Sequence, residues 1–158
     1  MKILRRVLLV LVVLVLVAWA FVPGIVERRM NKVLNPPPYH ASAAAEALHK
    51  KLLVADLHAD SLLWKRNLLE RSSRGEVDLP RLQDGNVGIQ AFTLVTTSPR
   101  GLNIYKNSDD TDQIQLLAIA QGWPPPTWNS PKMRALYEAS KLQRFAEDSQ
   151  GKLVVIKS

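Results

Sequence analysis

His58 and Asp60 are the two side chains whose types and spacing most clearly indicate chemistry. They stand at the polar end of an apolar segment, residues 52–60, which reads LLVADLHAD. Such a segment is typical of a strand buried on both faces, and side chains two residues apart on a strand point to the same side. An imidazole and a carboxylate that project together form a chelating pair suited to zinc or a similar divalent ion. The pair predicts part of a metal site, although a His-x-Asp triplet alone also recurs by chance in turns.

Other polar residues are better explained as surface or capping groups. His40 and His49 flank a predicted helix over residues 41–51 at a spacing too wide for one metal site. The aspartates that open a predicted helix over residues 109–122 are typical of an acidic first turn. Ser61 lacks the Gly-x-Ser-x-Gly frame of a nucleophilic serine. Cysteine is absent from the sequence, which excludes thiolate catalysis and disulfides.

Strand-like and helical segments alternate along the chain, and the fold that this alternation predicts determines where His58 and Asp60 lie. The predicted elements after residue 40 are helices over 41–51, 78–86, 109–122 and 130–147 and strands over 52–60, 87–96 and 153–156. The alternation predicts a parallel α/β unit with right-handed connections. The carboxyl ends of parallel strands meet at one edge of the sheet, so His58 and Asp60 are expected at the edge where active sites of α/β barrels collect.

The first 26 residues form a separate hydrophobic segment. An uncharged run extends from Val7 to Val26 and is long enough, at 1.5 Å per residue, to cross a hydrocarbon core of roughly 30 Å. The basic residues Lys2, Arg5 and Arg6 precede the run and favour a cytoplasmic N-terminus. We predict an N-terminal transmembrane helix over residues 1–26 that serves as a signal anchor, with the rest of a single-pass protein on the extracytoplasmic, periplasmic side. The alternative is a secreted protein cleaved near Ala20, since Ala18-Trp19-Ala20 fits a signal-peptidase site.

Residues 27–40 are predicted to be a linker, because Pro36-Pro37-Pro38 favours an extended polyproline spacer. Residues 41–158 then form the domain. The formal net charge of the chain is +7, and three of its 21 Lys and Arg lie in the leader; the remaining 18 are scattered among 14 Asp and Glu. This distribution excludes a nucleic-acid partner, which would require a basic stripe or face. The membrane is the expected partner.

Two stretches of the sequence resemble a known enzyme family. DLHADSLLW at residues 56–64 and EVDLPRLQDGNVGIQAFTLVT at residues 76–96 look like the opening of the membrane dipeptidase family, the renal dipeptidase-type zinc metallopeptidases. The resemblance extends from about residue 41 to the end of the chain, and its motifs arrive in family order. The mammalian version has Asn where Ala59 stands and Pro soon after Asp60, so the resemblance is to a bacterial-type relative and leaves substrate preference open.

The resemblance implies a (β/α)8 TIM barrel of the metal-dependent amidohydrolase type. His58 and Asp60 would bind one of two zinc ions, and a water activated by both metals would hydrolyse dipeptide substrates. In the family, the bridging carboxylate and two further histidines come from later strands. A whole barrel takes roughly 250 residues. Residues 41–158 are therefore expected to form a partial barrel, containing its first strands and helices, in an N-terminal fragment that is inactive by itself.

Two other function classes stay open at this point. A different metal-dependent amidohydrolase would use the same His58 and Asp60. A non-catalytic, membrane-tethered binding module would carry the pair incidentally. The sequence leaves the oligomeric state and the natural dipeptide open.

Overall fold

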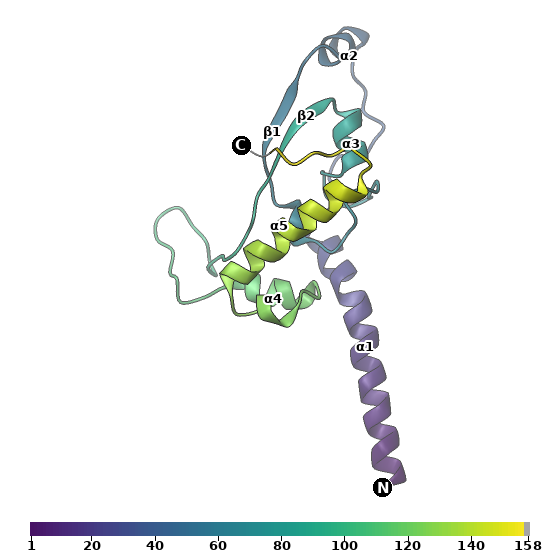
Figure 1. Cartoon of the computed structure of the whole chain (residues 1–158), viewed down its shortest axis with the longest axis vertical. Helices are drawn as coiled ribbons and strands as arrows, with labels where there is room; N and C mark the ends of the chain where they lie inside the picture. The colour runs from purple at the N-terminus through teal and green to yellow at the C-terminus, as the bar shows by residue number, and fades with distance from the viewer. Residues whose placement is uncertain (157–158) are drawn as a thin grey trace.

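A long N-terminal helix leads into a domain that contains a small parallel sheet and four further helices, of which the last is the longest (Figure 1). The structure is a computed structural model that describes residues 1–156. Its elements are α1 (Lys2–Met30), α2 (Ala43–His49), β1 (Val54–Ala59), the 3-10 turn η1 (Ser61–Leu63), α3 (Leu79–Asp84), β2 (Val87–Phe92), α4 (Gln113–Ala120), the 3-10 turn η2 (Pro125–Thr127) and α5 (Pro131–Asp148). The predicted α/β class is confirmed as a mixed fold of helices and parallel strands.

The two strands pair in parallel, as predicted. Val54 lies opposite Val87, and Ala59 lies opposite Phe92. α3 crosses between the strands, which gives the expected strand, helix, strand order. β2 is shorter than the predicted strand over residues 87–96, because β1 turns into η1 after Ala59 and has no further strand residues to pair with those beyond Thr93.

Side-chain caps begin four of the helices, and three of these caps, Ser42, Asp78 and Ser130, are at the predicted places. Four residues accept a hydrogen bond from a backbone N–H of the turn that follows: Ser42, Asp78, Asp112 and Ser130. Such caps satisfy amide groups that have no partner within the helix. The predicted helix over residues 109–122 begins later than expected, at Gln113, because Asp112 takes the capping position.

The prediction of a third strand over residues 153–156 is wrong. This segment has no regular secondary structure, and the sheet of residues 1–156 contains only β1 and β2. Its first residue is instead held at the end of α5, where the Ser149 hydroxyl accepts a hydrogen bond from the Leu153 N–H (3.0 Å) and donates one to the Ala146 carbonyl (2.7 Å). Backbone groups engaged in this way are not free for a strand ladder.

The expectation that the first strand is buried on both faces is also wrong. Leu53, just before β1, is 77% exposed, and Leu57 within β1 is 75% exposed. β1 has a strand neighbour on one edge only. No element of the described chain covers these two leucines, which a central strand of a parallel sheet would have buried.

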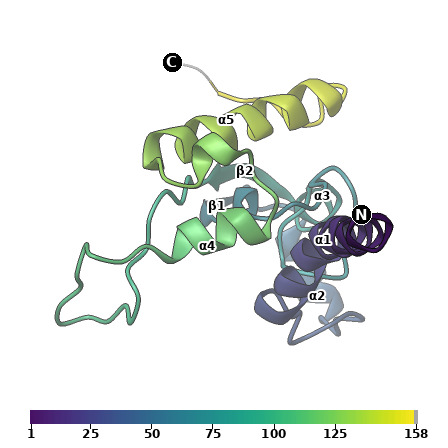
Figure 2. The ribbon, with the colours of Figure 1, turned by 90° about the horizontal axis from the view of Figure 1, so that it is seen from below.

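The core lies between η1, α4, the loop that follows α4, and α5. Five buried residues form it: Leu63, Trp64, Ile114, Ala118 and Trp123. Tyr137 of α5 packs on Trp123 with ring centroids 4.9 Å apart. In Figure 2, α5 runs along one side of the sheet, and the loop between β2 and α4 projects away from the rest. The segment that follows β1 is therefore held in place by contacts with α4 and α5, which come from the C-terminal half of the described chain.

α1 is long and apolar enough to cross a membrane, and it projects away from the sheet in Figure 1. It does not stop where the uncharged run ends. The helix continues through Met30, so residues 27–30 of the predicted linker are helical. Pro23 and Glu27 are buried against the folded domain, and Val26 packs on its core. The C-terminal turns of the leader are thus part of the domain.

Candidate metal-binding edge of the sheet

His58 and Asp60 lie together at the carboxyl edge of the parallel sheet. His58 is near the end of β1 and Asp60 follows the strand. His58 Nε2 is 3.3 Å from Asp60 Oδ1, and the two side chains are 72% and 45% exposed. The strand therefore brings the two predicted ligands side by side and leaves both accessible from solvent.

Thr93, directly after β2, fixes the position of Asp60. Its hydroxyl donates to Asp60 Oδ1, and its backbone N–H donates to the carbonyl of Ala59 at 3.1 Å. The neighbouring strand thus reaches the carboxylate through both side chain and backbone. Residue 93 falls inside the predicted second strand, and only the register of β1 against β2 reveals that it meets Asp60.

Asp56 supports the backbone of His58 from two residues earlier. Asp56 Oδ1 accepts the His58 N–H at 3.1 Å, and Asp56 Oδ2 accepts a hydrogen bond from the Gln90 side chain of β2 at 2.8 Å. The Gln90 and His58 hydrogen bonds hold the pKa of Asp56 below its usual value, because both stabilise the carboxylate. The alternation Asp56, His58, Asp60 could have signalled this residue in the sequence, since all three lie on the period of a strand.

α5 holds the turn that follows Asp60. Lys141 donates to the carbonyls of Leu62 (2.7 Å) and Trp64 (2.6 Å), and burial lowers its pKa to about 8. Glu138, one turn earlier, is fully buried, and its carboxylate oxygens have no hydrogen-bond partner. Burial raises the pKa of Glu138 to about 7, and the negative charge of Asp60 acts in the same direction. Neither residue carries a signal in the sequence, because the burial of both depends on how α5 packs.

The two other histidines stay away from this edge. The backbone carbonyl of His49 accepts a hydrogen bond from Asn86, which precedes β2, so His49 lies near the amino ends of the strands. His40 is exposed in the segment before α2. The interpretation of both as residues without a metal role stays compatible with their positions.

The geometry of the pair fits chelation. Two ligands about 2.0–2.2 Å from a tetrahedral zinc lie about 3.3–3.6 Å apart, and the His58 and Asp60 atoms are 3.3 Å apart. An imidazole nitrogen and a carboxylate oxygen are also a donor set that zinc accepts. Within residues 1–156, no group of three or more His, Cys, Asp or Glu side chains is arranged to hold a metal ion. The described chain offers two ligands at one point.

Comparison of this chain with protein-family models, with curated proteins and with solved structures finds no match.

Proposed function

We propose that this chain is the N-terminal, membrane-anchored part of a zinc dipeptidase of the membrane dipeptidase type. The observation that carries the proposal is the His58 and Asp60 pair, 3.3 Å apart at the carboxyl end of a parallel strand. Zinc held there would supply a Lewis acid and an activated water for hydrolysis of a peptide bond. Thr93 and Asp56 would act as positioning residues, because they hold Asp60 and the His58 backbone in place.

Under this proposal, β1 and β2 are the first two strands of a (β/α)8 barrel. Their parallel pairing through α3 and the exposed leucines on β1 support it. A cavity of about 520 Å³ also lies beside β2, with apolar side chains such as Ile89, Phe92 and Val154 among its lining. The second zinc ion and the remaining ligands would come from later strands of such a barrel.

The proposal places the domain on the extracytoplasmic side of an uncleaved anchor. Lys2, Arg5 and Arg6 before the apolar run support this orientation. Retention of the leader is supported by Trp19, whose ring lies 6.2 Å from that of Trp128. Cleavage near Ala20 would remove this contact and release a secreted domain, which is the alternative.

The test uses the product of the complete reading frame, purified in detergent and assayed for zinc content and for hydrolysis of a panel of dipeptides. We expect zinc to copurify and His58→Ala or Asp60→Asn to lower hydrolysis by more than about 100-fold. His49→Ala, at the opposite end of the strands, is the matched control and should leave both measurements unchanged.

Three results would argue against this assignment. Absence of both zinc and dipeptide hydrolysis would favour a non-catalytic tethered module. Unchanged dipeptide hydrolysis in His58→Ala would show that His58 is not a ligand of the active site. Zinc binding with hydrolysis of other amides but not of dipeptides would favour a different amidohydrolase.

A further inference from the structure

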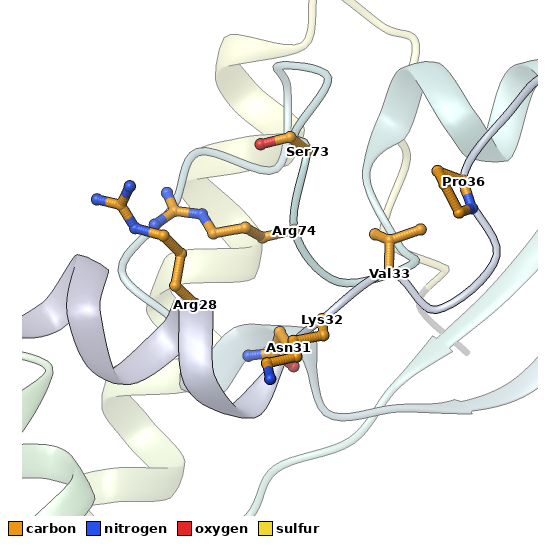
Figure 3. A pocket seen from close by; sticks show the side chains of 7 residues that line it. All are labelled: Arg28, Asn31, Lys32, Val33, Pro36, Ser73 and Arg74. Carbon is orange, nitrogen blue, oxygen red and sulfur yellow. The ribbon is translucent and has the colours of Figure 1, made fainter.

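A basic pocket lies where α1 enters the folded domain. It encloses about 570 Å³ and opens to solvent. Figure 3 shows the side chains that line it: Arg28, Asn31, Lys32, Val33, Pro36, Ser73 and Arg74. Three of these carry a positive charge, and they come from two segments far apart in the sequence. The volume is within the range of about 300–1,000 Å³ typical of small-molecule sites.

Contacts between α1 and the segment around residue 74 form the walls of this pocket. Arg74 donates to the Gly24 carbonyl at 3.1 Å, and the Gly75 N–H donates to the Asn31 carbonyl at 3.0 Å. The buried carboxylate of Glu27 lies 3.1 Å from Arg66 and 3.6 Å from Arg74. These contacts hold the two segments together, so the pocket is preformed.

Positive charge and unused donors accumulate inside the pocket. The Arg28 side chain donates to the same Gly24 carbonyl as Arg74, at 3.4 Å, so two guanidinium groups converge on one oxygen. Within residues 1–156, neither Arg28 nor Lys32 forms an ion pair with a carboxylate. The buried Asn31 Nδ2 has no hydrogen-bond partner. Converging cations with a free amide donor match a planar or tetrahedral oxyanion, and arginine is well suited to phosphate.

The position of the pocket indicates where this anion comes from. The uncharged run ends at Val26. The folded domain packs on α1 from Trp19 and Pro23 onward, so a bilayer that α1 crosses ends near Trp19. At 1.5 Å per helical residue, Arg28 follows Trp19 by about 13 Å, on the water side of the headgroup layer. Val33 and Pro36 add an apolar wall to the pocket. Phosphate is the charged group that phospholipids present at the adjoining membrane surface.

We propose that this pocket binds the headgroup phosphate of an anionic phospholipid. Arg28 and Lys32, which have no carboxylate partner within residues 1–156, would neutralise the charge, and Arg74, Asn31 and Ser73 would donate hydrogen bonds. The site requires α1 in the bilayer and is independent of the His58 and Asp60 pair. A net positive pocket favours an anionic headgroup over a zwitterionic one, whose added cation it repels.

Calorimetric titration of the full chain in detergent micelles tests this binding. Dihexanoyl phosphatidylglycerol is the main probe, dihexanoyl phosphatidylcholine and inorganic phosphate are the comparison probes, and titration into protein-free micelles subtracts partitioning. We expect saturable binding of phosphatidylglycerol at one site. The double variant Arg28→Gln/Lys32→Gln should bind it roughly 20-fold more weakly. Arg29→Gln is the matched control, because Arg29 has the same charge on the same turn but does not line the pocket.

A second variant, Ser73→Glu, places a carboxylate in the pocket at an exposed position and should abolish binding of phosphatidylglycerol. Thermal unfolding of each variant checks that the chain still folds. The proposal is overturned if no probe binds saturably, or if Arg29→Gln weakens binding as much as the double variant. Inorganic phosphate that binds as tightly as the lipid would reassign the site to a free phosphate, and equal binding of phosphatidylcholine would refute the preference for anionic lipid.

Discussion

The carboxylate of Glu27 and the guanidinium of Arg66 form a buried ion pair, 3.1 Å apart, with side chains only 2% and 5% exposed. Glu27 is the first charged residue after the uncharged run of the leader. Burial lowers the pKa of Arg66, and the Glu27 carboxylate opposes that effect. The pair joins the end of α1 to the segment that follows His58, Asp60 and the turn η1 in the sequence.

Removal of the Glu27 carboxylate is expected to destabilise the fold strongly. Glu27→Gln leaves the buried Arg66 without a counter-charge, and the free energy of unfolding should fall by about 3 kcal/mol. Chemical denaturation of the full chain in micelles measures this change. Glu76→Gln is the control, since Glu76 is exposed and should change stability by less than about 0.5 kcal/mol. Equal effects of the two variants would mean that the pair contributes nothing.

Arg134 is expected to be the most sensitive position of α5. Its side chain is 1% exposed, pairs with Asp112 and donates to the carbonyls of Thr96, Thr127 and Trp128. Arg134→Leu should lower the free energy of unfolding by about 3–5 kcal/mol, because four acceptors lose their donor. The exposed Lys132→Gln serves as control. A loss below about 1 kcal/mol for Arg134→Leu would contradict this role.

Glu138 should make stability depend on pH. Its pKa is raised to about 7 in the folded chain from 4.5, so the folded state binds the proton more tightly than the unfolded state does. This stabilisation is complete below pH 4.5 and is lost as the pH rises through 7. Glu138→Gln changes the free energy of unfolding by one amount at pH 5 and by another at pH 8. The change at pH 8 should be more stabilising by about 1–3 kcal/mol.

Denaturation midpoints at the two pH values measure the Glu138 effect. Glu147→Gln, on an exposed position of the same helix, is the control and should show no such difference. If Glu138→Gln shifts stability equally at pH 5 and pH 8, the carboxylate is not the titrating group.

Trp19 packs where Gly122 has no side chain. A Cβ added to Gly122 would lie 3.1 Å from Trp19 Nε1, and Gly122 has a φ of +69°. Gly101 has a similar φ of +67° and nothing within 4 Å, so Gly101→Ala measures the backbone cost alone, about 1–2 kcal/mol. Gly122→Ala should cost more by about 1 kcal/mol, and Trp19→Ala should remove that difference in a double-mutant cycle. Persistence of the full difference would show that Trp19 does not contact this turn.

Thr93 is expected to strengthen zinc binding without being a zinc ligand itself. Thr93→Val removes the hydroxyl that donates to Asp60, and in the product of the complete reading frame we expect zinc affinity to fall about 10-fold. Thermal stability should change little, because Asp60 is partly exposed. Thr97→Val, at an exposed position after the strand, is the control. Unchanged zinc affinity would argue against a positioning role.

Local signals in the sequence predicted much of the fold. Asp78, Ser130 and the other caps carry their signal within a single turn, and the apolar segment before His58 shows its strand period directly. The proximity of His58 and Asp60 follows from the same period.

Contacts between segments far apart in the sequence carry no local signal and could not be predicted. Glu27 meets Arg66 across 39 positions of the chain, and Lys141 reaches the carbonyl of Leu62 across 79. Such pairs depend on the docking of α1 and α5, which no local pattern reports. Residues 153–156 have the composition of a strand but do not form one. The Leu153 N–H donates its hydrogen bond to the hydroxyl of Ser149 instead of to a neighbouring strand.

The burial of Pro23 and Glu27 has a consequence for orientation. A domain on a flexible spacer tumbles freely above its anchor, whereas in this chain buried contacts join the C-terminal turns of α1 to the folded domain. When α1 is inserted in a bilayer, the sheet edge that carries His58 therefore has a fixed orientation relative to the membrane normal. Rotation of the domain is then the rotation of the anchor itself, slowed by lipid viscosity.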